Sequence, residues 1–101
     1  MIVALSDIRI KPGMQREIDA AITRGLEELI SKSPGYRGHR VQRGVDAPER
    51  YALMVYWESL EAHTVAFAQS PRAAQWHALV EPYLARPPRV EHFALLTPPT
   101  R

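Results

Sequence analysis

The segment YALMVYWESLEAHTVAFAQSPRAAQWH, residues 51–77, carries the clearest structural signal in this chain. It opens with a strand that is apolar on both faces, enters a short helix at Ser59, and restarts as a second helix at Ser70 and Pro71. A strand that is hydrophobic on both faces needs cover on both sides, and a chain of 101 residues has helices for only one side. We therefore expect a second copy of the protein to cover the other face.

The composition fits one small globular domain. Of the 101 residues, 46% are hydrophobic and 24% are charged, which is ordinary for a soluble protein. We expect a single domain over residues 1–97 and a frayed tail over residues 98–101. There is no apolar run near the roughly 20 residues of a membrane span, and the first residues do not have a signal-peptide pattern. The chain has no cysteine, which excludes disulfides and thiolate chemistry, and we expect a cytoplasmic location.

The charge of the chain gives little support to nucleic-acid binding. The isoelectric point is about 9.3, but the formal net charge is only +2. Arginines make up most of the basic residues, and their high pKa raises the isoelectric point while adding little net field. The cluster Arg37, Arg40, Arg43 and Arg50 fits a solvated hairpin rim better than a phosphate track. We expect no nucleic-acid partner and no membrane association.

The hydrophobic pattern predicts the order β-α-β-β-α-β, with the second helix broken in two. Gly25 either weakens the middle of the first helix or marks close packing there. Right-handed crossovers turn this order into a four-stranded antiparallel sheet with both helical layers on one face. The expected elements are a strand at 2–10, a helix at 14–32, strands at 36–45 and 50–58, a short helix at 59–69, a helix from 70 that ends or kinks at Pro82, and a strand at 89–96.

The sheet face opposite the helices keeps apolar side chains on three strands. Exposed, that face would exceed the few hundred Å² of apolar surface that a monomer usually tolerates, so sheet-to-sheet dimerisation is the simplest remedy. The pattern leaves open which set of alternating residues faces outward. The alternatives are Val3 and Leu5 or Ile2 and Ala4 on the first strand, Tyr51, Leu53 and Val55 or Met54 and Tyr56 on the third, and Phe93 and Leu95 or Val90 and Ala94 on the last.

Several motifs along the chain belong together. They are KPG at 11–13, SPG at 33–35, YWESLEAH at 56–63, QSP at 69–71, Trp76, and PPRVEHF at 87–93. This set resembles the antibiotic biosynthesis monooxygenase family, and the resemblance covers essentially the whole chain. It implies two ferredoxin-like α+β subunits joined into a dimeric α/β barrel, with a pocket between the sheet and the helical layer of each subunit. Some members resemble cofactor-independent oxygenases that convert polyketide or quinol substrates into quinones, and one branch degrades haem.

The family's polar residues match this chain only in part. The haem-degrading branch uses an Asn on the first strand, a Trp on the short helix and a His on the next helix. These positions fall on or next to Ser6, near Ala66 or Phe67, and on His77. Only the histidine matches, which disfavours haem degradation. The polyketide-oxidising branch also uses an Asn, and this chain contains none.

Histidines are the candidate catalytic residues. Oxygen chemistry without a cofactor needs a deprotonated, electron-rich substrate, an apolar cavity, a base and donors for the resulting anion. His63 and His77 are the candidate bases, although His63 also fits a helix-surface or dimer contact and His77 a partly exposed position. His92 shares a strand face with apolar neighbours and is expected to be a satisfied core or interface residue, whereas His39 is expected to be solvated.

Aromatic and polar residues complete the predicted site. Trp57 and Trp76 could line a flat aromatic substrate, although aromatics at these spacings also fit a core. Tyr83 and Arg40 could donate hydrogen bonds to a quinol oxygen, and the resemblance adds Ser6 and Phe67. The histidine spacing matches no metal motif, and we expect no metal and no cofactor.

Two other classes of function compete with an enzyme. The same dimeric barrel could be a non-catalytic protein that binds a small molecule, which the missing family residues favour. RNA-recognition modules share the element order, but their third strand needs glycines and exposed aromatics. The corresponding segment here, RYALMVYW at 50–57, has no glycine and is too aliphatic.

Overall fold

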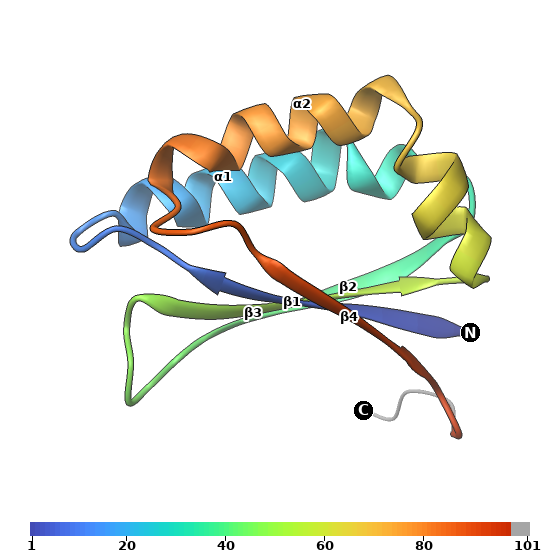
Figure 1. The fold of residues 1–101 in the computed structure, drawn as a ribbon, viewed down its shortest axis with the longest axis horizontal. Coiled ribbons are helices and arrows are strands. Elements are labelled where there is room, and N and C mark those ends of the chain that lie inside the picture. The colour runs from blue at the N-terminus through green and yellow to red at the C-terminus, as the bar shows by residue number, and fades with distance from the viewer. Residues whose placement is uncertain (98–101) are drawn as a thin grey trace.

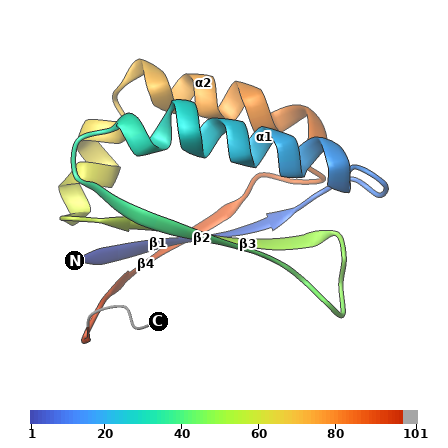
Figure 2. The same cartoon turned by 180° about the vertical axis from the view of Figure 1, so that it is seen from behind.

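The structure, a computed structural model, describes residues 1–97. Four strands form one antiparallel sheet in the order β2-β3-β1-β4, and the helices lie together on one of its faces (Figures 1 and 2). This arrangement confirms the predicted ferredoxin-like α+β fold. Its elements are β1 (Ile2–Arg9), α1 (Gln15–Glu28), the 3-10 turn η1 (Ile30–Lys32), β2 (Tyr36–Arg43), β3 (Arg50–Trp57), the π-helix η2 (Ala62–Phe67), α2 (Pro71–Val80), the 3-10 turn η3 (Glu81–Tyr83) and β4 (Arg89–Ala94).

The structure bears on two further features, the C-terminal tail and the possibility of a membrane-spanning helix. The tail expected at residues 98–101 lies outside the described residues. In the part that the structure describes, no helix has the length and apolarity needed to cross a membrane.

The core fills the space between the helices and one face of the sheet. The register pairs Ala4 with Val55 and Ile8 with Tyr51, so these four side chains share the helix-covered face. The helices contribute the apolar stripe that the sequence predicts for α1, together with part of α2. The buried core includes Ile18, Ile22 and Leu26 of α1, Leu53 and Trp57 of β3, Phe67 of η2, and Ala73, Trp76 and Val80 of α2.

The first helix ends earlier than the sequence predicts. The predicted helix runs to residue 32, whereas α1 ends at Glu28 and the chain tightens into the 3-10 turn η1. Ser33 is already extended because it precedes Pro34, and a residue before proline is pushed out of the helical region. Its hydroxyl donates a 3.1 Å hydrogen bond to the carbonyl of Leu29, which helps to satisfy the end of the helix.

The second helical layer is broken where the sequence predicts. The Ser59 hydroxyl accepts a 3.2 Å hydrogen bond from the Ala62 backbone N–H, as an N-cap does. Pro71 begins α2, but the Ser70 hydroxyl donates to the Phe67 carbonyl at 2.7 Å instead of capping α2. The closing strand β4 ends at Ala94, two residues before the predicted end.

The opposite face of the sheet carries no helix of the described chain (Figures 1 and 2). Pairing places Val3 between Tyr56 of β3 and Phe93 of β4, and Leu5 opposite Met54, so one set of the alternatives faces outward. Val3 is buried by its neighbours, whereas Phe93 is 47% exposed. We call these five residues the open-face patch.

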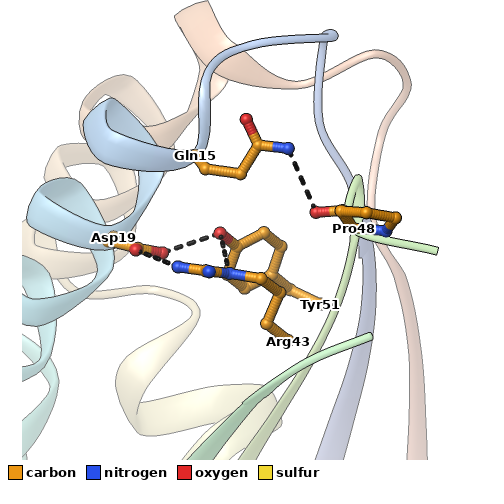
Figure 3. Close-up of polar contacts among 5 residues, drawn as sticks. All are labelled: Gln15, Asp19, Arg43, Pro48 and Tyr51. Atoms are coloured by element: carbon orange, nitrogen blue, oxygen red, sulfur yellow. Dashed lines mark hydrogen bonds and ion pairs between the residues drawn. The ribbon is translucent and has the colours of Figure 1, made fainter. Parts of the chain in front are cut away.

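A polar cluster ties α1 to the β2–β3 hairpin (Figure 3). The Tyr51 hydroxyl donates to Asp19 at 2.7 Å and accepts a hydrogen bond from Nε of Arg43 at 3.0 Å. Arg43 also forms an ion pair with Asp19, and the Gln15 amide donates to the Pro48 carbonyl. Burial, reinforced by the hydrogen bond to the Asp19 carboxylate, raises the pKa of the Tyr51 phenol. The cluster therefore fixes how the hairpin sits against the helix.

Candidate functional site

A cavity of about 620 Å³ lies between the sheet and the helical layer, on the β1–β4 side. Its size falls within the roughly 300–1,000 Å³ that is typical of small-molecule sites. Segments far apart in the sequence meet there. They contribute Ser6 and Ile8 from β1, His63 and Phe67 from η2, Trp76, His77 and Val80 from α2, and Glu81, Leu84, Arg86, Pro87, Pro88 and Val90 from the chain that leads into β4.

The walls of the cavity are largely apolar and well supported. Ile8, Phe67, Trp76 and Val80 are all buried, so their positions are set by the core. The Trp76 ring packs directly on the backbone of α1, because a Cβ added at Gly25 would lie 2.4 Å from its Cε3 atom. Gly25 therefore marks close packing, which was one of the two interpretations of its place in the helix.

The π-helix η2 positions His63. The backbone N–H of Ala68 donates to the His63 carbonyl at 3.0 Å, a spacing of five residues that widens the helix. Such π-turns occur frequently at functional sites. Gly35, in a left-handed conformation with φ +85°, allows η2 to approach, because a Cβ there would lie 2.6 Å from that of Ala62.

The His63 ring has two defined contacts. It stacks on Trp57, with ring centroids 5.2 Å apart and an interplanar angle of 14°. Its Nδ1 lies 2.8 Å from Nε2 of His92 on β4, which is hydrogen-bonding distance. Burial and, to a smaller extent, the neighbouring His92 lower the pKa of His63 to about 4, so the ring is neutral at pH 7.

Arg86 is the cationic group at the cavity. Its Nη2 lies 3.5 Å from a carboxylate oxygen of Asp7, which also pairs with Arg50 at 3.3 Å. Its Nε is buried and has no hydrogen-bond partner in the described part of the chain. A buried donor without a partner is unfavourable, and an anionic oxygen of a ligand would satisfy it.

Five of the residues predicted for the site come together at the cavity. They are Ser6, His63, Phe67, Trp76 and His77. The imidazole of His77 is exposed and that of His63 is half-buried, so the two candidate bases face different surroundings. Within residues 1–97, no three His, Cys, Asp or Glu side chains gather in an arrangement that could hold a metal ion.

Three other predicted residues do not line this cavity. Trp57 is buried in the core beneath His63, and Tyr83 packs against the core from η3. Arg40 pairs with Met54 and therefore lies on the helix-free face of the sheet. The β-bulge between Tyr36 and Gly38 causes this, because one extra residue reverses which side chains of β2 face the helices.

Two residues at the site were not among the predicted ones. Arg86 sits in a Pro-rich connection, where the sequence shows no periodic pattern to orient it. His92, expected to be a core or interface residue, is exposed in the single chain and therefore not in its core, and it is hydrogen-bonded to His63; its place at an interface stays a prediction. The alternation of β4 correctly places the His92 side chain on the same face as Val90. It does not predict that this side chain meets His63 of η2, because that contact joins distant parts of the chain.

Comparison with known proteins agrees with this geometry. The family model described as "Antibiotic biosynthesis monooxygenase" matches residues 1–79. The chain belongs to the antibiotic biosynthesis monooxygenase family. The resemblance seen in the sequence motifs is thereby confirmed.

Relatives of this family share the fold over nearly their whole length. A structure from Bordetella bronchiseptica, named for the same family, has 30% identity and a TM-score of 0.88, covering 95% of this chain and 97% of its own. The uncharacterized protein YczJ of Bacillus subtilis is 35% identical over 86 residues, which is 85% of this chain and 90% of that protein. SnoaB, a cofactor-independent oxygenase from Streptomyces nogalater, has a TM-score of 0.81 at 14% identity, covering 96% of this chain and 94% of its own, and so shows the fold alone.

Proposed function

We propose that this protein is a monooxygenase that uses no bound cofactor and acts on a small aromatic, polyketide or quinol-type substrate. A base removes the hydroxyl proton of the substrate, and the electron-rich anion transfers one electron to O₂. The two radicals combine in a new carbon–oxygen bond, and the resulting peroxide takes up a proton and eliminates water. One oxygen atom stays in the quinone product. The other leaves as water with the two hydrogens that the substrate loses.

The observation that carries this proposal is the largely apolar cavity with imidazoles at its wall, in a chain of this family. Flat walls from Trp76 and Phe67 suit a planar aromatic molecule. An apolar surround also strengthens any hydrogen bond made to the substrate anion. The cavity volume of about 620 Å³ has room for a molecule of two or three fused rings.

The polar residues of the cavity have distinct proposed roles. His63 or His77 acts as the base, His63 from the more enclosed position. The Ser6 hydroxyl and the buried Nε of Arg86 are the donors for the anionic oxygen. Trp57 supports His63 by stacking and does not contact the substrate itself. Tyr83 and Arg40 have no role in this form of the proposal.

We also infer that two copies pair through the open-face patch to form the dimeric barrel. Its apolar side chains, including the 47% exposed Phe93, provide the reason for pairing. The polar groups at the rim, where Asp7 pairs with Arg9 and Arg50, would surround this apolar centre as in other interfaces.

The alternative function is a small-molecule binding protein without catalysis. The low pKa of His63, about 4, favours it, because a group that resists protonation is a weak base. The absence of any asparagine, which the family resemblance implies on or next to Ser6, favours it as well.

Oxygen uptake separates the two functions. Purified protein is mixed with a panel of quinols and hydroxynaphthalenes in an oxygen electrode, and His63→Gln and His77→Gln are compared with wild type. The enzyme proposal predicts uptake above the protein-free rate and a loss in at least one variant of about 10²-fold. Absence of uptake, combined with a rise in melting temperature when the ligands are added, would establish the binding protein.

A further inference from the structure

We propose that His92 serves as a proton relay that carries the substrate proton from His63 in the cavity to bulk solvent. The inference rests on the proposed function, because it requires a substrate that is deprotonated in the cavity. It names a positioning residue that acts through His63 and does not touch the substrate.

The two rings are arranged as a two-step path. Nδ1 of His63 and Nε2 of His92 are 2.8 Å apart, which leaves Nε2 of His63 as the ring nitrogen available to a ligand in the cavity. His63 is half-buried and lines the cavity, whereas His92 is exposed on the edge strand β4. The path therefore begins inside the site and ends in water.

Stacking on Trp57 keeps this path aligned. The indole and imidazole planes differ by only 14°, and Phe67 lies 6.0 Å away on η2 at an interplanar angle of 27°. The rings of Trp57 and Phe67 are themselves 5.5 Å apart, so His63 packs at one side of this aromatic pair, and turning its Nδ1 away from His92 would break the 2.8 Å hydrogen bond. The stacking therefore fixes the plane of the ring, and the hydrogen bond to His92 fixes which nitrogen is turned toward the cavity.

The surroundings of His63 also explain why a relay is needed. Burial disfavours a positively charged ring, and the pKa of about 4 expresses this. A proton that arrives at Nε2 must therefore leave promptly. Transfer of the Nδ1 proton to His92 restores a neutral His63, and the exposed His92 then releases its own Nδ1 proton to water. One proton leaves the substrate and one enters solvent, and each ring ends neutral but in its other tautomer. When the peroxide later takes up a proton, the same path runs in reverse, from water through His92 and His63, and restores both starting tautomers.

Other ionisable groups near the path do not replace His92. His77, Glu81 and Arg86 line the same cavity, but no hydrogen bond joins any of them to His63 within residues 1–97. Glu91, adjacent in the chain, pairs with Leu5 and so lies on the opposite face of the sheet. His92 is the proton acceptor in contact with Nδ1.

Anaerobic proton release tests the relay without requiring oxygenation. Wild-type protein and 1-naphthol are mixed under nitrogen in weak buffer with a pH-indicator dye, and the rate of proton release is recorded by stopped flow. Wild type should release a proton as the naphthol ionises. His92→Gln keeps a hydrogen-bonding side chain but cannot pass a proton through it, so release should slow by at least about tenfold while naphthol affinity is retained.

Two further variants make the test specific. His39→Gln removes another exposed histidine, one bonded to Tyr36 away from the cavity, and should release protons at the wild-type rate. In His92→Ala, added imidazole should restore the rate, which a merely structural role of His92 would not allow. Wild-type rates in His92→Gln, failure of imidazole rescue, or failure of wild type to ionise bound naphthol would each overturn the relay. Proton release through His92 without any oxygen uptake would instead overturn the proposed function and leave the relay standing.

Discussion

Replacing Gly25 with alanine tests whether the packing of α1 on α2 holds the wall of the cavity. The new methyl group would lie 2.4 Å from Cε3 and 2.5 Å from Cζ3 of Trp76, against an ordinary carbon–carbon contact of roughly 3.5–4.0 Å. The indole must therefore move by more than about 1 Å. Trp76 is only 8% exposed and has little room to move except toward the cavity.

Two opposing effects determine how much Gly25→Ala changes the free energy of unfolding. Alanine favours the helix over glycine by about 1 kcal/mol. Overpacking a well-filled core costs typically 1–3 kcal/mol, and a contact this close belongs at the upper end. Gly25→Ala should therefore lower the free energy of unfolding by about 2 kcal/mol, which corresponds to roughly 8–16 °C in melting temperature for a domain of this size.

Urea denaturation followed by tryptophan fluorescence measures this effect. The matched control is Thr23→Ala, an exposed position on the same helix, which should stabilise by a few tenths of a kcal/mol. Gly25→Ala should also weaken the binding of 1-naphthol, because the displaced indole narrows the cavity. A variant that is about 1 kcal/mol more stable than wild type would show that helix propensity alone operates and would refute the packing argument.

Three further perturbations address the rest of the molecule. Tyr51→Phe removes the hydroxyl that bonds to both Asp19 of α1 and Arg43 of β2, and should lower the free energy of unfolding in urea by about 2 kcal/mol. A change near zero would show that this cluster does not hold the hairpin against the helix. The pKa of His63 is about 4 in the folded chain and 6.5 in the unfolded chain, so the unfolded chain binds the proton first as the pH falls. The free energy of unfolding of the wild type should therefore decline as the pH is lowered from 6.5 to 4. His63→Gln should lack that component of the decline, and an unchanged pH profile would contradict the assigned pKa. Phe93→Asp should convert a dimer into monomers in analytical ultracentrifugation, whereas Val65→Asp, a position equally exposed at 47% on the helical side, should not; dimers in both variants would place the interface elsewhere.

The fold could be predicted from local signals. The alternation of residues 2–10 and the stripe of α1 identify the elements, and the Ser-Pro boundaries mark where helices stop and restart. Ser59 and Pro71 begin their helices as expected because caps and proline act over one turn of chain. The strand order follows from connection rules that hold for most proteins.

The site could be predicted only where a residue's own element decides its direction. Trp76 lies on a clearly patterned helix and reaches the cavity, as does Ser6, which the family resemblance and not the pattern predicts. The direction of Arg40 could not be read from the sequence, because it depends on a single-residue bulge that no hydrophobic pattern in the Arg-rich strand reveals. The contact between His63 and His92 joins residues 29 positions apart and depends on the register of β4 and the widened turn of η2, both of which are tertiary properties.

Isotope labelling tests most directly whether the cavity performs oxygen chemistry. Hydroxynaphthalenes are incubated with metal-depleted protein under ¹⁸O₂, and the products are analysed by mass spectrometry. We expect a quinone that carries one ¹⁸O atom, formed faster than without protein, with the protein-dependent fraction lost in His63→Gln or His77→Gln. Equal amounts of product with and without protein across the panel would contradict the proposal and leave the chain as a binding protein.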